Sequence, residues 1–427
     1  MGQTGDMRDQ VDVAVVGGGA AGIAAARRIM RCPGLSVLVL EAGDRLGGRA
    51  HTVGDAVPID LGCGWLHSAL TNVWTGIAEQ TPGFTVDRRP APWDDPDRHL
   101  GLSQAEHQSY ERVMADLDAR IDAEARRGND GPLADLVPAG SRWRGLLDAF
   151  STYVSGAELD CVSLIDSFEY RPGEGDDWRV VEGYGRLVAH HGREVPAMLN
   201  TVVSTIDHTG ADAIRIETDR GTVSAKAVIV TVSTDVLAAE AIRFRPALAA
   251  KIEAATCLPL GLADKLFLNI MRPQLFPLDG YCMGSVSTGR TAAYHLRPLD
   301  RPFIECFYGG DLARDLEREG FAAAFSFAKG EIAGQLGAAA AAAVEPLRMT
   351  AWGRERHVRG SYAYARPGAA GMRARLAETV DGRLFFAGEA CSPERFTTAH
   401  GAYETGAAAA EAIVASLGQP RSAEPMS

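Results

Sequence analysis

The sequence has few cysteines and no long hydrophobic run, and both shortages narrow the class of protein. Its seven cysteines are scattered, odd in number and never spaced Cys-x-x-Cys, which argues against a disulfide framework or a metal site and favours reduced thiols. No run of 18 apolar residues occurs, so no membrane-spanning helix is predicted. The N-terminus and residues 418–427 are polar, without a secretory signal or an anchor. We therefore expect a cytoplasmic protein that does not bind a membrane.

The chain also has fewer basic than acidic residues. The chain has 43 basic and 55 acidic residues and a formal net charge of −12. This balance argues against nucleic acid as a partner, and it is compatible with a cationic substrate or with solubility alone. With 427 residues, 46% of them hydrophobic, we expect one large domain or two. Whether the protein is a monomer or a homodimer is left open.

A glycine-rich loop near the N-terminus organises the chain. The apolar, β-branched stretch 11–16 predicts a buried parallel strand, and the Ala-rich stretch 20–31 predicts a helix. Between them, Gly17 allows a tight turn, Gly19 lets the backbone approach a pyrophosphate, and Gly22 lets the helix pack closely on the strand. The helix N-terminus would offer free N–H groups to phosphate. This spacing indicates a dinucleotide site.

A second strand supports that interpretation. Residues 36–40 are apolar and end at Glu41, whose carboxylate can accept both hydroxyls of an adenosine ribose. The alternative is a plain β-α-β unit with a chance acidic residue. The next stretch, 41–52, is rich in glycine and arginine: Gly48 allows close approach, while Arg45 and Arg49 can neutralise phosphate or fix neighbouring backbone. An extended flavin dinucleotide needs such a second loop and a nicotinamide site does not, so we expect FAD.

From this loop onward the chain resembles the flavin-containing amine oxidase family, which includes monoamine oxidases, polyamine oxidases and lysine-specific histone demethylases. The resemblance is strongest over residues 13–52, 60–67, 264–268, 360–362 and 384–406. It implies an α/β fold with a two-dinucleotide-binding (Rossmann-like) FAD domain and an α+β substrate-binding domain. The FAD domain would comprise residues 1–75, 178–260 and 380–420, and the substrate-binding domain 76–177 and 261–379.

Four residues are catalytic candidates on this resemblance. Trp65-Leu66-His67 is similar to a polyamine oxidase segment, which would put His67 at the mouth of the amine site; an exposed or capping histidine is the alternative. Lys265 stands in an otherwise apolar strand, where a charge needs a reason. The family places there a lysine linked through water to flavin N5; a lysine snorkelling at a sheet edge is the alternative. Tyr362 would be one wall of an aromatic cage, and Thr398 falls where monoamine oxidases have the second wall.

The resemblance also implies how FAD is held. Monoamine oxidases have a flavin-linked cysteine before the cage tyrosine, whereas this chain has Ser361, so we expect non-covalent FAD. A helix beginning near Ala399 would direct its positive end at the flavin. The expected cofactor-binding residues are Gly17, Gly19, Ala21, Gly22, Glu41, Ala42, Arg45, Gly48, Arg49, Gly64, Trp65, Val203, Trp352, Gly388, Glu389, Thr398 and Ala399.

The function implied is FAD-dependent oxidation of a primary or secondary amine, with polyamines among the candidates. The amine α-carbon would give a hydride to flavin N5, the imine would hydrolyse, and O₂ would be reduced to H₂O₂. An L-amino-acid oxidase is the nearest alternative. It needs an arginine for the carboxylate, and the sequence identifies none in that role, with Arg297 and Arg356 left open. Further alternatives are a flavin dehydrogenase or desaturase that uses another acceptor, and a scaffold without turnover.

In the regions of the chain between the segments of the predicted FAD domain, the sequence predicts one helical part and one part with strands. We expect a long surface helix over 103–127 with Ser103 as N-cap, a second helix over 142–154, strands over 291–297 and 303–308, and a helix in the Ala-rich run 337–344. The acidic stretch 158–182 could bind substrate ammonium groups or form a solvated loop.

Overall fold

The computed structural model describes residues 10–95, 98–171, 173 and 175–417. The two chain ends, for which the sequence predicts neither a signal nor an anchor, lie outside these residues. Within the described ranges, no helix has both the length and the apolar character needed to cross a bilayer. The same ranges contain no cluster of three or more His, Cys, Asp or Glu residues suited to a metal ion.

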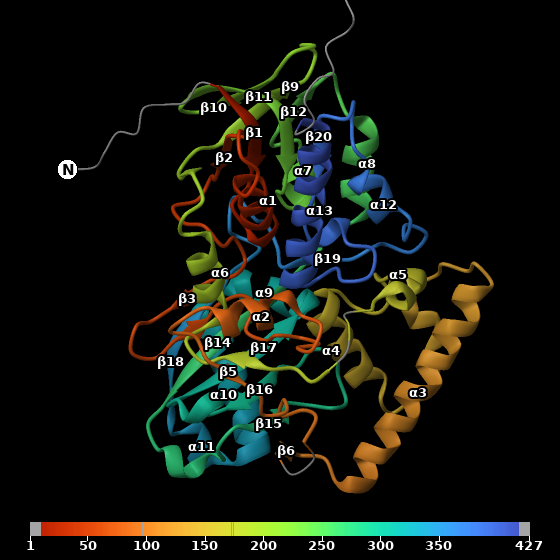
Figure 1. Cartoon of the computed structure of the whole chain (residues 1–427). Helices are drawn as coiled ribbons and strands as arrows, with labels where there is room; N and C mark the ends of the chain where they lie inside the picture. The colour runs from red at the N-terminus through yellow and green to blue at the C-terminus, as the bar shows by residue number, and fades with distance from the viewer. Residues whose placement is uncertain (1–9, 96–97, 172, 174, 418–427) are drawn as a thin grey trace, which may run out of the picture.

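The upper half of the molecule in Figure 1 is built on a mixed sheet of eight described strands. They are β1 (Gln10–Val16), β2 (Val37–Leu40), β8 (Ala197–Met198), β9 (Val203–Asp207), β10 (Ile214–Thr218), β11 (Gly221–Val230), β12 (Arg243–Arg245) and β20 (Leu384–Phe386). β1 runs parallel to both β2 and β11, and β20 is parallel to the end of β11. The carboxyl ends of β1, β2 and β11 therefore meet at one edge of the sheet.

Helices cover both faces of this sheet, which explains why β1 and β11 both end in buried apolar runs, residues 13–16 and 227–230. On one face lie α1 (Ala20–Met30) and α13 (Ala399–Leu417), packed on Val13, Val15 and Ile229. The other face is covered by α7 (Thr234–Ala238), α8 (Ala249–Cys257) and α12 (Met372–Ala377). The helix and strands predicted from residues 11–40 are confirmed.

A second sheet forms the lower half of the molecule in Figure 1. It contains β6 (His99–Leu100), β14 (Ala263–Ile270), β15 (Gly280–Met283), β16 (Ala293–Leu296), β17 (Phe303–Gly309) and β18 (Val344–Met349). One face is covered by α9 (Gly310–Glu319), α10 (Phe321–Leu336) and α11 (Ala338–Ala341), which bury the side chains of Leu266, Leu268 and Ile304. The opposite face carries Lys265 and Phe307 and looks towards the first sheet.

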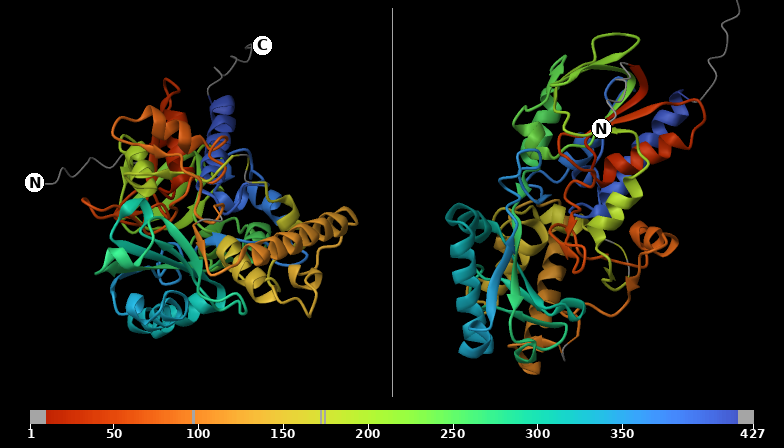
Figure 2. Two further views of the ribbon diagram at one scale, coloured as in Figure 1. Left: turned by 90° about the horizontal axis from the view of Figure 1, so that it is seen from below. Right: turned by 90° about the vertical axis from the view of Figure 1, so that its left-hand side faces the viewer.

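Three helices of the region between β6 and β7 (Arg179–Val180) extend along the side of the molecule (Figures 1 and 2). They are α3 (Gln104–Arg126), α4 (Arg144–Ser155) and α5 (Leu164–Glu169). The predicted N-cap is confirmed: the Ser103 side chain accepts from the backbone N–H of Glu106, and the Glu106 carboxylate accepts from that of Ser103. The predicted second helix corresponds to α4.

The remaining elements are short connections around the two sheets. They are α2 (Val73–Gln80), α6 (Tyr184–Gly192) and the two-stranded pairs β3 (Thr52–Val53) with β4 (Ile59–Asp60), β5 (Val86–Asp87) with β7, and β13 (Leu260–Gly261) with β19 (Tyr362–Ala363). They bring loops from distant parts of the chain to the space between the sheets.

The helix predicted over 337–344 is wrong in its extent. Only the four residues of α11 are helical, and β18 begins at Val344, where it pairs with Ile270 of β14. Gly337, with φ of 88°, separates α11 from α10. Alanine favours a helix locally, but the free edge of β14 provides strand hydrogen bonds that outweigh this preference.

The distribution of strands between the two sheets supports our proposed domain boundaries. The first sheet takes its strands from residues 10–40, 197–245 and 384–386, and the second from 99–100 and 263–349. We propose an FAD domain of residues 1–75, 178–260 and 380–420 and a substrate-binding domain of 76–177 and 261–379.

A buried ion pair connects α5, in the helical region between β6 and β7, to α12. The Arg373 guanidinium donates to both carboxylate oxygens of Asp166, at 2.6 and 2.8 Å, and both side chains are at most 2% exposed. Asp166 also accepts from the backbone N–H of Ala365. Because the pair joins α5 to α12, it holds the two segments in a fixed relation.

We expect Arg373→Met to lower the free energy of unfolding by about 3–5 kcal/mol, because it leaves the Asp166 carboxylate buried without its partner. Arg120→Met is the matched control: Arg120 pairs with Asp116 on the exposed surface of α3, so its loss should cost less than about 1 kcal/mol. Urea unfolding followed by tryptophan fluorescence compares the two. Equal, small losses in both variants would contradict a stabilising role for the buried pair.

Candidate active site

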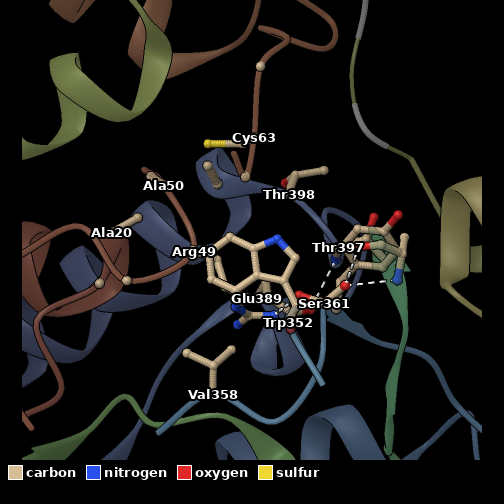
Figure 3. A pocket seen from close by; sticks show the side chains of 18 of the residues that line it. Ala20, Arg49, Ala50, Cys63, Trp352, Val358, Ser361, Glu389, Thr397 and Thr398 are labelled. Carbon is tan, nitrogen blue, oxygen red and sulfur yellow. Dashed lines mark hydrogen bonds and ion pairs between the residues drawn. The ribbon is translucent and has the colours of Figure 1, made fainter. Parts of the chain in front are cut away.

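A cavity of about 970 Å³ runs from the carboxyl end of β1 to the face of the second sheet that carries Lys265 and Phe307. At one end it is lined by bare backbone of the glycine-rich loop, and at the other by side chains from β14, β16 and β17. Figure 3 shows Arg49, Glu389, Ser361, Trp352 and Thr397 gathered around its middle part. We call the two ends the loop half and the strand half.

The loop half has the features expected of a dinucleotide site. The carboxylate of Glu41 accepts from the backbone N–H of Gly18 at 2.5 Å and from that of Gly43 at 2.6 Å. A carboxylate has about four acceptor sites, so both oxygens retain capacity for ribose hydroxyls. Gly17 adopts a φ of 107°, a conformation that favours glycine.

The two arginines of the second loop have different environments. Arg45 donates to the backbone carbonyls of Gly48, at 2.7 Å, and Ala50, at 3.2 Å, and does not line the cavity. It therefore fixes the loop instead of reaching a phosphate directly. Arg49 does line the cavity, and it donates to the carboxylate of Glu389 at 2.9 Å and to the carbonyl of Ser361.

Glu389 links three parts of the chain at the middle of the cavity. It is 5% exposed, and its carboxylate accepts from Arg49 and from the backbone N–H groups of Ala363 and Thr397, each of the two at 3.1 Å. The adjacent Gly388 lines the cavity, and the position of a Cβ on it is open. Backbone without a side chain therefore faces the cavity here.

The N-terminus of α13 also reaches the cavity. The Thr398 hydroxyl donates to the carbonyl of Arg395 at 2.6 Å and accepts from the N–H of Gly401 at 3.0 Å, so it caps the helix. The preceding Thr397 has a φ of 62°, which is rare for a β-branched residue. Thr398 and Ala399 both line the cavity.

The structure brings most of the predicted cofactor-binding residues together. Those that line the cavity are Gly17, Gly19, Ala21, Glu41, Ala42, Gly48, Arg49, Gly64, Trp65, Val203, Trp352, Gly388, Glu389, Thr398 and Ala399. Gly22 and Arg45 do not line it. Gly22 lets α1 pack closely against the glycine-rich loop, and Arg45 holds the second loop through hydrogen bonds to its backbone carbonyls. The bare backbone, the helix N-termini of α1 and α13 and the acceptor capacity of Glu41 fit an extended dinucleotide such as FAD.

In the strand half, Lys265 lies on β14 with its side chain only 8% exposed. Its ammonium donates to the backbone carbonyl of Asp60 at 3.0 Å and contacts a carboxylate oxygen of Glu305 at 2.8 Å. It lines the cavity beside Gly64, where an added Cβ would be 3.4 Å from the Lys265 nitrogen. Lys265 is therefore a buried, paired cation at the cavity wall and does not extend to solvent at a sheet edge.

Aromatic side chains form much of the strand half. The Tyr362 hydroxyl donates to the backbone carbonyl of Tyr153 at 2.6 Å, and burial raises the pKa of Tyr362. The Tyr153 ring packs against Phe307 with centroids 5.7 Å apart, and Trp65 packs edge-on against Trp93 at 4.5 Å. All five rings line the cavity and offer apolar walls and π faces to a substrate cation.

His67 lies at the cavity wall in contact with a carboxylate. Its Nδ1 is 2.9 Å from Asp177, and 46% of its side chain is exposed. Burial alone would raise the pKa of Asp177, but hydrogen bonds from His67 and the Ser68 N–H outweigh it and keep that pKa below its ordinary value. For Asp94, burial followed by the nearby Asp177 and Asp176 charges raises the pKa. Several carboxylates therefore lie close together at this part of the cavity wall.

Sequence analysis missed several residues of the strand half. They are Trp93, Asp94, Tyr153, His295, Glu305 and Phe307, all of which line the cavity. Glu305 carried a usable signal, because it is a lone charge in an apolar strand, as Lys265 is. Of the described acidic residues between 158 and 182, Asp177 lines the cavity, whereas Asp166 and Glu158 bind protein groups elsewhere.

We expect Gly22→Ala to weaken dinucleotide binding strongly, because a Cβ on Gly22 would overlap the carbonyl oxygen of Gly17 and displace the loop. Gly330→Ala is the control: it lies in α10, its Cβ position is open, and alanine should be tolerated there or stabilise by about 1 kcal/mol. The measurement is the flavin content of the two purified variants and their affinity for added FAD. Full retention by Gly22→Ala would contradict this geometry.

Comparisons with known proteins agree with this arrangement. Residues 15–80 match the model of an NAD(P)-binding Rossmann-like domain, and residues 85–414 match that of the flavin containing amine oxidoreductases. The chain is 27% identical to polyamine oxidase 4 of Oryza sativa subsp. japonica, covering 93% of this chain and 88% of that protein. It is 29% identical to lysine-specific histone demethylase 1 homolog 2 of the same organism, covering 94% of this chain and 57% of that protein.

Solved structures share the fold at lower identity. Putrescine oxidase bound to putrescine has a TM-score of 0.76 at 20% identity, covering 95% of this chain and 99% of that one. Cyclohexylamine oxidase from Brevibacterium oxydans IH-35A has a TM-score of 0.74 at 21% identity, covering 96% and 100%. Since the family match spans most of the sequence, this chain belongs to the flavin-containing amine oxidoreductases and is an FAD-dependent amine oxidase.

Proposed function

We propose that this enzyme oxidises a primary or secondary amine that carries a further cationic group, as diamines and polyamines do. The observation that carries the proposal is the charge of the strand half. Among the described residues, four carboxylates line it, those of Asp94, Glu111, Asp177 and Glu305, against the one ammonium of Lys265. Burial raises the pKa of Asp94, and the nearby charges of Asp177 and Asp176 raise it further. A substrate with more than one ammonium would neutralise these carboxylates.

The names of the relatives support the same substrate class. Several curated relatives are polyamine oxidases, and a putrescine complex is among the structures of similar fold. We assign diamines and polyamines because the cavity adds carboxylates to the aromatic walls that any amine requires.

The residues of the strand half would bind and orient the amine. FAD held by the residues of the loop half would supply the redox chemistry, by which an amine is oxidised at its α-carbon to an imine that hydrolyses and O₂ is reduced to H₂O₂. Tyr362 and Phe307 would confine the reacting carbon between aromatic faces, and Lys265, paired with Glu305, would offer its ammonium as a hydrogen-bond donor during oxygen reduction. His67, held by Asp177, would contact substrate nitrogen, and Thr398 would cap the helix that faces the cofactor.

The positions of the arginines argue against an L-amino-acid substrate. Among the described residues, the arginines that line the cavity are Arg49, Arg356 and Arg359. Arg49 is paired with Glu389, and Arg356 and Arg359 flank Val358, whose carbonyl accepts from Ser233 beside the end of β11. Arg297 contacts Asp300 and Phe276 and does not line the cavity. A substrate carboxylate would therefore meet carboxylates in the strand half.

The test is anaerobic mixing of the flavin-loaded enzyme with a panel of amines while the flavin absorbance is followed. We expect bleaching by diamines and polyamines, slower bleaching by monoamines of equal chain length, and none by L-amino acids. Peroxide should appear when air is admitted. Asp94→Asn should raise KM for a polyamine by about tenfold and change that for the monoamine less, since it removes one carboxylate from the cavity. Bleaching only by L-amino acids would overturn the proposal, and bleaching without peroxide would indicate a dehydrogenase.

We expect FAD to be held without a covalent bond. Ser361 lines the cavity at the position where monoamine oxidases have the flavin-linked cysteine, and its hydroxyl donates to the carbonyl of Ala263 at 2.7 Å and accepts from that residue's N–H at 2.8 Å. Acid precipitation of the purified enzyme should leave all flavin absorbance in the supernatant. Yellow colour retained in the washed precipitate would contradict this expectation.

A further inference from the structure

Glu305 lies on the cavity-facing side of the second sheet. In the antiparallel pair of β14 and β17, Glu305 is opposite Phe267 and Phe307 is opposite Lys265. Side chains two residues apart share a face, so Lys265 and Glu305 emerge on the same side. The neighbouring residues Ile304 and Cys306 point the other way, into the core beneath α9 and α10. The chain therefore places an acidic side chain in an otherwise apolar strand and directs it at the cavity.

The contact between these two side chains is direct. A carboxylate oxygen of Glu305, Oε1, is 2.8 Å from the Lys265 nitrogen, and the side chains are 19% and 8% exposed. The backbone carbonyl of Asp60 receives a second hydrogen bond from that ammonium. Within the described part of the chain, no donor reaches the other carboxylate oxygen of Glu305, and the residue lines the cavity.

This pairing changes the charge that a substrate meets. A lone ammonium in a partly buried wall would repel a cationic amine, and the repulsion would be strong because the site is shielded from water. Glu305 makes the Lys265 wall neutral overall while leaving the lysine in place. It also restrains a long, flexible side chain to one direction, which lowers the entropic cost of aligning the ammonium.

We propose that Glu305 is the positioning residue for Lys265: it fixes the direction of the ammonium and cancels its charge, so that a polycationic amine can enter the strand half. The polycationic substrate in this proposal rests on the proposed function. The new element is the role of Glu305 in positioning Lys265. Glu305 acts through Lys265 and is not itself a reacting group.

The test compares Glu305→Gln with Glu305→Asp and with Glu345→Gln. Glutamine keeps the shape and removes the charge, whereas aspartate keeps the charge on a shorter side chain. Glu345 is an exposed acid on β18 of the same sheet, so its variant controls for the loss of one carboxylate outside the cavity.

In Glu305→Gln we expect KM for a diamine to rise at least about tenfold, because one uncompensated positive charge remains beside the substrate. KM for a monoamine of equal length should rise less, and kcat should change less than KM. The midpoint potential of the bound flavin should move to a more positive value, since a negative charge has been removed from the wall of the cavity proposed to hold the cofactor. Glu305→Asp should restore part of both effects, and Glu345→Gln should show neither.

Two results would overturn the proposal. One is an unchanged flavin potential in Glu305→Gln. The other is an equal rise of KM for both amines, which would indicate a steric defect. The potential does not depend on the substrate. If the wild-type enzyme oxidised no amine, the proposed function would fail, while the potential would still decide whether Glu305 balances the charge of Lys265.

Discussion

The close approach of α1 to α13 is the constraint on which the cavity depends. A Cβ on Gly406 would overlap the carbonyl oxygen of Ala21, so glycine at this position lets the two helices touch. Their N-termini then reach the same cavity, although nearly 380 residues separate them in the chain. Because each helix N-terminus presents unpaired N–H groups, an anionic cofactor is stabilised from two directions by backbone alone. The glycines at Gly17, Gly48 and Gly388 leave this backbone uncovered.

Local patterns in the sequence were sufficient for β1, α1 and β2 of the first sheet and for α3. The strand, loop and helix of residues 11–31 and the capping box at Ser103 depend on neighbours within a few positions, so they could be predicted. The Ala-rich run could not, because β18 exists only through its pairing with β14, some 75 residues away in the chain. Sequence patterns describe a helix preference well and an available strand edge poorly.

The same distinction applies to the site. Lys265 was found because a charge in an apolar strand is costly unless it has a partner, and the partner turned out to be another such charge, Glu305. Asp177 could not be singled out among its acidic neighbours, since its contact with His67 joins segments 110 residues apart. For Arg45 the sequence left two roles open, neutralising phosphate or fixing neighbouring backbone, and its hydrogen bonds to loop carbonyls agree with the second.

The net charge of the chain does not indicate the substrate, whereas the distribution of charged side chains within the cavity does. Arginines and helix N-termini lie around the loop half, where a dinucleotide would bring negative phosphates. The carboxylates of Asp94, Asp177 and Glu305 lie around the strand half, where an amine would bring positive charge. An acidic surface alone would give solubility without selectivity. Because the two halves of the cavity differ in charge, the dinucleotide and the amine would each have one favourable orientation. The uncharged reacting part of each would then lie at the aromatic walls between the halves.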